Sequence, residues 1–156
     1  MKKIIKKSRA FGTIVVPPSK SYAHRLLIAS ALSQSECTIE NVECSKDILA
    51  TLSCLKSLGL DYTFQDRKII ITKSLDESIQ NVTLNCDESG STLRFFIPLS
   101  LTKCEHVKCI GTPRLMSRGL TIYEDIFREQ GIAYTKNEKS ISMDGRLKSG
   151  YFKVKG

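Results

Sequence analysis

The hydrophobic and polar positions of this chain follow one pattern that occurs twice, with a period of about 70 residues. In each copy, a strand-like apolar run leads into a segment whose apolar residues have helical spacing. A short strand-like run, a second helical segment, a glycine and a hairpin-like pair of strands follow. The sequence therefore predicts the order β-α-β-α-β-β in each copy, and an α/β (α+β) fold with helices on one side of small sheets.

The first copy occupies residues 15–80 and the second occupies residues 81–149. The strands and helices predicted for the first copy are residues 13–16, 26–32, 37–39, 47–58, 62–64 and 68–72. Those predicted for the second copy are residues 82–86, 95–101, 106–108, 120–130, 134–136 and 140–143. Helical spacing places Ile48, Leu52 and Leu55 on one face, and Ile122 and Ile126 on one face of the corresponding helix.

Two segments are exceptions to this pattern. Pro98 falls inside the third predicted helix, where proline removes a backbone hydrogen bond, so we expect the helix to kink or end there. Residues 150–156 alternate in polarity and predict the first strand of a third unit that the chain does not complete. We therefore expect the chain to be a truncated protein.

The composition narrows the class of protein. No apolar run approaches the roughly 20 residues that span a bilayer, and the basic start lacks the apolar stretch of a secretory leader. We therefore expect a cytoplasmic protein that does not enter membranes. The six cysteines lack Cys-x-x-Cys spacing, which favours small buried side chains over a metal site. The net charge of +8 indicates an anionic partner, which could be nucleic acid, acidic lipid or a phosphorylated metabolite.

The clearest candidate site in the first copy is its strand-to-helix junction, Pro17-Pro18-Ser19-Lys20-Ser21-x-x-x-Arg25. A helix start presents free backbone N–H groups and a positive dipole end, which bind anions. Ser21 and Arg25 are four residues apart and share a helix face, so with Lys20 they could bind a phosphate. The residues equally allow a serine N-cap followed by solvated cations. We assign no catalytic role to His24.

The second copy has an equivalent junction at residues 87–94. Gly90 allows close approach of a ligand to the backbone, although a structural glycine in a capping loop is the alternative. Arg114 and Arg118 precede the next helix and could face the same anion. Asp47 is the corresponding residue of the first copy, where a favourable acid in a first helical turn is the simpler interpretation. We expect the two junctions to face one shared hollow.

Four motifs, in this order and at these spacings, resemble the EPSP synthase family. They are Gly12-x-Ile14-x-Val16-Pro17-Pro18-Ser19-Lys20-Ser21-x-Ala23-His24-Arg25, Asp47-x-x-Ala50-Thr51, Glu88-Ser89-Gly90-Ser91-Thr92-x-Arg94-Phe95 and Arg114-Leu115-x-x-Arg118. The resemblance implies a fold of six β-α-β-α-β-β units in two domains, of which two units are present here. It also implies that residues 1–14 form a strand segment that belongs partly to the missing domain.

The resemblance implies transfer of the enolpyruvyl group of phosphoenolpyruvate to the 5-hydroxyl of shikimate 3-phosphate, without a metal or organic cofactor. It implies that Lys20 is catalytic and contacts both substrates. Ser21 and Arg25 would bind shikimate 3-phosphate, and Gly90 and Arg118 would bind phosphoenolpyruvate. We expect these small phosphorylated substrates as partners, with no nucleic acid or membrane.

The expected assembly follows from the same resemblance. The full enzyme would be a monomer, and the fragment would be inactive alone and could self-associate over the surface that the missing units cover. The alternative function is a stand-alone anion-binding or nucleic-acid-binding module, which the net charge of +8 permits. An enolpyruvyl transferase with a nucleotide-sugar acceptor is disfavoured by Ser21, because those enzymes have asparagine at that position.

Overall fold

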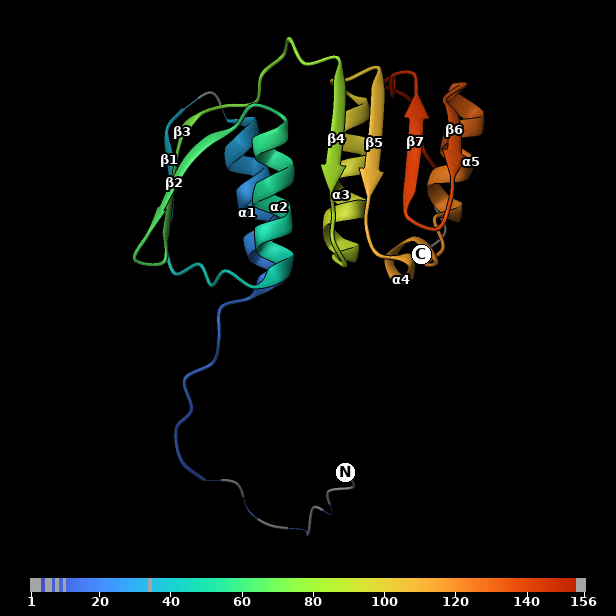
Figure 1. Cartoon of the computed structure of the whole chain (residues 1–156). Helices are drawn as coiled ribbons and strands as arrows, with labels where there is room; N and C mark the ends of the chain where they lie inside the picture. Colours follow the sequence, from blue (N-terminus) through green and yellow to red (C-terminus); the bar gives the residue numbers. More distant parts are fainter. Residues whose placement is uncertain (1–3, 5–6, 8, 10, 34, 154–156) are drawn as a thin grey trace.

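Helices and strands form at most of the positions that the hydrophobic pattern predicts (Figure 1). The computed structural model describes residues 4, 7, 9, 11–33 and 35–153 of the chain. The elements of the first copy are α1 (Lys20–Leu32), β1 (Cys37–Ile39), α2 (Lys46–Ser57), β2 (Asp61–Gln65) and β3 (Lys68–Lys73). Strand β3 lies between β1 and β2 and is antiparallel to both, so this copy builds a three-stranded sheet.

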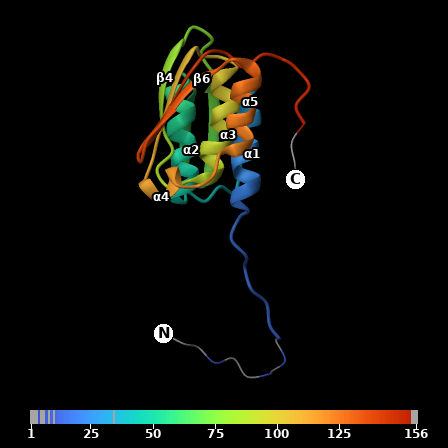
Figure 2. The same cartoon turned by 90° about the vertical axis from the view of Figure 1, so that its right-hand side faces the viewer.

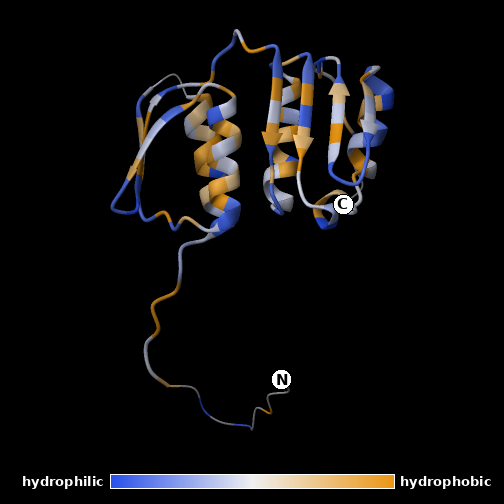
Figure 3. Cartoon of the chain, viewed as in Figure 1, coloured by the Kyte–Doolittle hydropathy of each residue, from blue (hydrophilic) through white to orange (hydrophobic). Residues whose placement is uncertain are grey.

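The second copy builds a four-stranded sheet with the order β4-β5-β7-β6. Its elements are β4 (Asn81–Asn85), α3 (Gly90–Leu101), β5 (His106–Ile110), α4 (Pro113–Met116), α5 (Thr121–Gln130), β6 (Ala133–Lys136) and β7 (Ser140–Asp144). Strand β4 is parallel to β5, and the other neighbours are antiparallel. Figure 3 shows hydrophobic and hydrophilic residues alternating along β4 and β5, as expected for strands with one buried face. Figure 2 shows α3 and α5 on one face of this sheet, as predicted.

The prediction of a strand at residues 13–16 is wrong. These residues have no regular secondary structure, and Val15 is 98% exposed. Strand β4, the counterpart in the second copy, pairs with β5 over its whole length, whereas β1 pairs only with β3 among the described residues. Pro17 and Pro18 also lack the N–H groups that a ladder needs. Without a paired neighbour the segment leaves the body of the protein (Figure 1).

The other two terminal predictions are only partly covered by the described residues. Residues 4, 7, 9 and 11–14 contain no strand, and the rest of the predicted segment 1–14 lies outside the described part of the chain. Residues 150–153 also contain no strand, so the start of a third unit is not formed there. Residues 154–156 lie outside the described part.

The two copies share one hydrophobic core, as predicted. Helix α2 packs against both β4 and α3, and it therefore joins the two sheets through a helical layer. Ile48, Leu52 and Leu55 on α2 are each at most 1% exposed, which confirms the predicted face. The cysteines are free, and the buried ones are Cys54, Cys86, Cys104 and Cys109. None of the helices in the described ranges has the length and apolar character needed to cross a membrane.

The inner face of α5 differs from the predicted one. Ile122 is 47% exposed, whereas Phe127 is buried and its ring centroid lies 5.3 Å from that of Tyr134 on β6. The aromatic contact with the following strand therefore determines how α5 is rotated. The predicted glycine after this helix is confirmed, because Gly131 adopts the left-handed conformation with φ +69°.

Helix α3 does not end at Pro98, contrary to our expectation. The helix continues from Gly90 to Leu101 because the hydrogen bond that proline cannot form is replaced. The carbonyl of Arg94, four residues earlier, would normally accept from the N–H of residue 98. Here it accepts a hydrogen bond from the hydroxyl of Tyr123 on α5, at 2.8 Å.

Candidate anion-binding site

Three helices begin at the same end of the molecule, the lower end in Figure 1. Their first residues are Lys20 of α1, Lys46 of α2 and Gly90 of α3. Each helix is preceded by a serine whose hydroxyl oxygen accepts one backbone N–H of the first turn: Ser19, Ser45 and Ser89. The other first-turn N–H groups have no partner within the helix. Three positive dipole ends therefore meet in one region, which favours an anion.

Asp47 joins the starts of α1 and α3. Its Oδ2 accepts a hydrogen bond from Nζ of Lys20 at 3.0 Å, and its carbonyl oxygen lies 3.4 Å from Oγ1 of Thr92. The sequence suggested only an ordinary first-turn acid at this position. The side chains of Lys20 and Asp47 are 59% and 37% exposed, and ion pairs that solvent reaches in this way contribute about 0–1 kcal/mol to stability. Lys20 can therefore leave Asp47 for a ligand at little cost.

A hollow of about 480 Å³ lies at the start of α3. The residues that line it are Lys46, Asp47, Asp87, Glu88, Ser89, Gly90, Ser91, Arg94 and Arg118. Gly90 allows two guanidinium groups to approach the backbone, because an added Cβ would lie 3.0 Å from Nη1 of Arg94 and closer still to Nη1 of Arg118. Arg94 also donates from Nη1 to the Gly90 carbonyl at 3.4 Å. Two arginines thus converge on one helix start.

The predicted shared hollow is formed as two neighbouring ones. The second hollow, also about 480 Å³, lies at the start of α1 and is lined by Pro17, Pro18, Ser19, Lys20, Ser21, Glu43 and Ser45. Lys20 in this hollow contacts Asp47 in the other, so the ion pair lies between them. A phosphorylated molecule that displaced Asp47 from Lys20 would reach both helix starts.

Arg25 and Arg114 line neither of these hollows. Nη1 of Arg25 donates to the Ser21 carbonyl at 2.8 Å, and its guanidinium lies over the ring of Phe95 on α3, with its Cζ 5.3 Å from the ring centroid. This cation–π contact holds Arg25 against the neighbouring helix. Arg114 forms an ion pair with Glu88 at 3.1 Å. Both cations are close to the site but are engaged by other groups.

Comparison with known proteins identifies the family. Residues 4–155 match the family model described as EPSP synthase (3-phosphoshikimate 1-carboxyvinyltransferase). The chain belongs to the EPSP synthase family. It is 43% identical over 160 residues to a 3-phosphoshikimate 1-carboxyvinyltransferase of Clostridium perfringens (strain SM101 / Type A), covering 100% of this chain and 38% of the relative. A relative of the same name in Clostridium novyi (strain NT) is 42% identical over 158 residues, covering 93% of this chain and 36% of the relative.

A solved structure supports the fold. EPSP synthase from Acinetobacter baumannii superimposes with a TM-score of 0.69 at 19% identity, covering 86% of this chain and 32% of that chain. The family model and the two relatives confirm the resemblance noted from the four motifs. This EPSP synthase family chain spans less than two fifths of the length of the relatives it matches, 38% for the first one.

Of the five predicted site residues, all but Arg25 line one of the two hollows. Lys20 and Ser21 line the hollow at α1, and Gly90 and Arg118 line the hollow at α3. Arg94 also lines the α3 hollow, although we did not assign it to the site. The repeat contained the signal, because Arg94 follows Gly90 by four residues as Arg25 follows Ser21.

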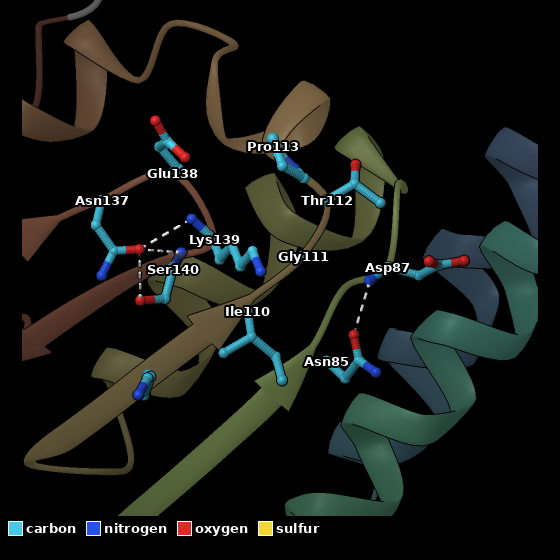
Figure 4. Close-up of a pocket in the computed structure, with 11 residues that line it drawn as sticks. Asn85, Asp87, Ile110, Gly111, Thr112, Pro113, Asn137, Glu138, Lys139 and Ser140 are labelled. Atoms are coloured by element: carbon cyan, nitrogen blue, oxygen red, sulfur yellow. Dashed lines mark hydrogen bonds between the residues drawn. The ribbon is translucent and has the colours of Figure 1, made fainter.

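A larger hollow of about 750 Å³ lies beside the ends of β4, β5 and β7 (Figure 4), and it shares Asp87 with the α3 hollow. Its polar groups serve mainly to close turns. Oδ1 of Asn137 accepts the backbone N–H groups of Lys139 and Ser140, each at 2.9 Å, and Oδ1 of Asn85 accepts the N–H of Asp87 at 3.0 Å. Because Lys20, Ser21, Gly90 and Arg118 line the two smaller hollows and not this one, the smaller hollows remain the better candidate site.

His24 lies behind the site and is buried. Its Nδ1 is 2.7 Å from Oγ1 of Thr51. Burial lowers the pKa of His24 below its usual value of 6.5; the carboxylate of Asp47 opposes this shift, and the charges of Lys20 and Arg25 add to it. The imidazole is therefore neutral at pH 7 and acts as a polar group within the core.

Proposed function

We propose that this chain forms the N-terminal part of the substrate site of a transferase that moves the enolpyruvyl group of phosphoenolpyruvate to the 5-hydroxyl of shikimate 3-phosphate. The reaction forms a bond between that hydroxyl oxygen and C2 of phosphoenolpyruvate. It breaks the bond between C2 and the phosphate oxygen and releases inorganic phosphate. The observation that carries the proposal is the position of Asp47 in a chain of this family: its carboxylate pairs with Lys20 at the start of α1, and its carbonyl oxygen lies 3.4 Å from Oγ1 of Thr92 at the start of α3.

Phosphoenolpyruvate is proposed to bind at the start of α3. Its carboxylate and phosphate are anions that suit the free N–H groups beside Gly90 and the guanidinium of Arg118, which lies next to that backbone. Gly90 keeps the guanidinium close because it has no side chain. Two acids of the same hollow hold nearby cations while no ligand is bound: Asp47 pairs with Lys20, and Glu88 pairs with Arg114.

Shikimate 3-phosphate is proposed to bind at the start of α1, through Lys20, Ser21 and Arg25. Lys20 and Ser21 line that hollow, so the hydroxyl and the ammonium group converge there. Arg25 would have to leave the Ser21 carbonyl and the Phe95 ring to reach the phosphate. Binding would replace those two contacts with a charge-assisted pair, which is stronger.

Lys20 is proposed to serve both substrates and the reaction. It lies between the two hollows, where its ammonium group could offset the repulsion between two multiply charged anions. Positioning and fixed charges then provide the rate enhancement. Because the chain spans only 38% of the length of the first relative, we expect substrate binding by this chain without turnover.

The test is a titration of the ¹⁵N-labelled chain with phosphoenolpyruvate and with shikimate 3-phosphate at constant ionic strength. We expect amide shifts at residues 19–22 and 89–92, the two helix starts. Lys20→Gln should weaken binding by about 10- to 100-fold, since a hydrogen bond to a charged group contributes about 1.5–3 kcal/mol. Lys68→Gln is the matched control, because Lys68 also forms an exposed ion pair, with Glu40.

Shifts confined to other surfaces, or equal losses in the two variants, would contradict the proposal. Steeply salt-dependent binding of an oligonucleotide that outcompetes both metabolites would favour the nucleic-acid-binding alternative instead.

A further inference from the structure

A row of buried polar side chains crosses the core behind the two hollows. Nδ1 of His24 on α1 lies 2.7 Å from Oγ1 of Thr51 on α2, and that oxygen lies 2.8 Å from Oγ1 of Thr92 on α3. Oγ1 of Thr92 donates to Oγ of Ser89 at 2.7 Å. The four side chains are between 0% and 3% exposed. The row therefore connects three helices entirely within the protein interior.

This row would destabilise the fold unless every member is hydrogen-bonded, because each buried polar group without a partner lowers the free energy of unfolding by about 1–3 kcal/mol. No buried side-chain nitrogen or oxygen lacks a partner in the described part of the chain. Each hydroxyl has one proton, so one consistent order has His24 donating to Thr51, Thr51 to Thr92, and Thr92 to Ser89. Aliphatic side chains would fill the same space without this constraint, so the row specifies geometry rather than adding hydrophobic burial.

One end of the row, Ser89, lines the α3 hollow, and the other end, His24, lies one helical turn from Lys20. Ser89 is the N-cap of α3, and its Oγ also accepts the Thr92 backbone N–H at 3.2 Å, so it determines where the helix begins at Gly90. His24 follows Lys20 by four residues and therefore lies one helical turn along the same face of α1. Oγ1 of Thr92 is in addition 3.4 Å from the carbonyl of Asp47, the residue that binds Lys20.

We propose that His24, Thr51 and Thr92 are positioning residues, which set the start of α3 at Gly90 relative to Lys20 on α1. They touch no ligand and act through the helix starts. The effect on ligand affinity rests on the proposed function, whereas the effect on helix position does not. Two measurements on the same variants therefore separate the two ideas.

The first measurement uses the ligand-free, ¹⁵N-labelled chain. Thr92→Val keeps the shape of the side chain and removes the hydroxyl. We expect it to shift the amide signals of residues 20–24 on α1 and the ring nitrogens of His24. Ser100→Ala is the matched control, because Ser100 is also a buried hydroxyl of α3 but donates within its own helix, to the carbonyl of Phe96. The control should leave α1 unchanged.

Two more variants complete this measurement, one that restores the hydroxyl and one that removes another member of the row. Thr92→Ser retains the hydroxyl and should keep the α1 signals at their wild-type positions. Should Thr92→Val fail to fold, Thr51→Val removes the middle link and is judged by the same signals. Shifts confined to α3, or equal shifts for the serine and valine variants, would overturn the proposal.

The second measurement is the affinity for phosphoenolpyruvate. We expect a loss of up to about tenfold for Thr92→Val and none for Ser100→Ala, because one net hydrogen bond contributes about 0.5–1.5 kcal/mol. If the wild-type chain binds no phosphoenolpyruvate while Thr92→Val still shifts the α1 signals, the positioning role stands and the proposed function fails. If Thr92→Val shifts the α1 signals but leaves a measurable affinity unchanged, the row sets the helix position without affecting the site, and the claim that it positions Lys20 for binding is refuted.

Discussion

Replacing Gly90 with alanine should weaken anion binding without destabilising the fold. Gly90 is the first residue of α3, and its φ is not positive, so alanine fits the backbone there. Alanine has the higher helix propensity, by up to about 1 kcal/mol in a helix interior and less at a first position. The free energy of unfolding of Gly90→Ala should therefore be equal to that of the wild type or slightly higher.

The loss of affinity comes from displacement of the two arginine side chains. The added Cβ would lie 3.0 Å from Nη1 of Arg94 and nearer to Nη1 of Arg118. Non-bonded atoms of this kind need about 3.5 Å, so the Arg118 guanidinium must move by roughly 1 Å or change rotamer. Losing one charge-assisted hydrogen bond costs about 1.5–3 kcal/mol, which corresponds to an affinity roughly 10- to 100-fold lower.

Calorimetric titration with phosphoenolpyruvate and urea denaturation measure the two quantities separately. Gly119→Ala is the control, because a Cβ at Gly119 meets no atom within 4 Å although the residue is adjacent to Arg118. Unchanged affinity in Gly90→Ala would refute the role of the arginines. A lower urea midpoint would refute the claim that flexible side chains absorb the added methyl group.

Two further predictions concern the core. Tyr123→Phe should lower the free energy of unfolding by about 1 kcal/mol, because the Arg94 carbonyl loses its partner at a partly exposed site. In a Pro98→Ala background the N–H of residue 98 supplies that bond, so equal losses in both backgrounds by urea denaturation would contradict this explanation of the helix. Because the pKa of His24 is lowered, the unfolded chain binds a proton there more readily than the folded one; stability should fall as the pH drops from about 6.5 towards the lowered pKa. This part of the pH dependence of urea denaturation should disappear in His24→Gln, and its persistence would contradict the assignment.

The hydrophobic pattern predicted most of the fold because the spacing of apolar residues and the glycines that end helices are local properties of the sequence. The face of α2 formed by Ile48, Leu52 and Leu55 follows from spacing alone. The errors came from contacts between elements. The strand at residues 13–16 has no paired neighbour among the described residues, and α5 turns Phe127 inward because Tyr134 lies opposite. Pro98 does not end α3, and the hydrogen bond that compensates for it comes from Tyr123, which is distant in sequence.

The candidate site was predictable in its residue types and less so in its contacts. The repeat located the two helix starts, and the EPSP synthase motifs assigned roles to Lys20 and Gly90. Sequence could not show that Asp47 binds Lys20, since the two residues belong to different helices. His24 was set aside because a single histidine carries no pattern; only its position opposite Thr51 in the core gives it a role.

The repeat extends to individual side-chain contacts, so the proposed function uses one local structure for two substrates. Arg25 donates to the carbonyl of Ser21, four residues earlier, and Arg94 donates in the same way to the carbonyl of Gly90. The two helix starts therefore have the same local contact, and they differ in the residues that pack against the arginine. Arg25 packs on Phe95 of the second copy, whereas Arg94 shares its hollow with Arg118. The first start thus offers one arginine held on an aromatic ring and the second offers two arginines beside a bare backbone, so the second can approach a small anion more closely.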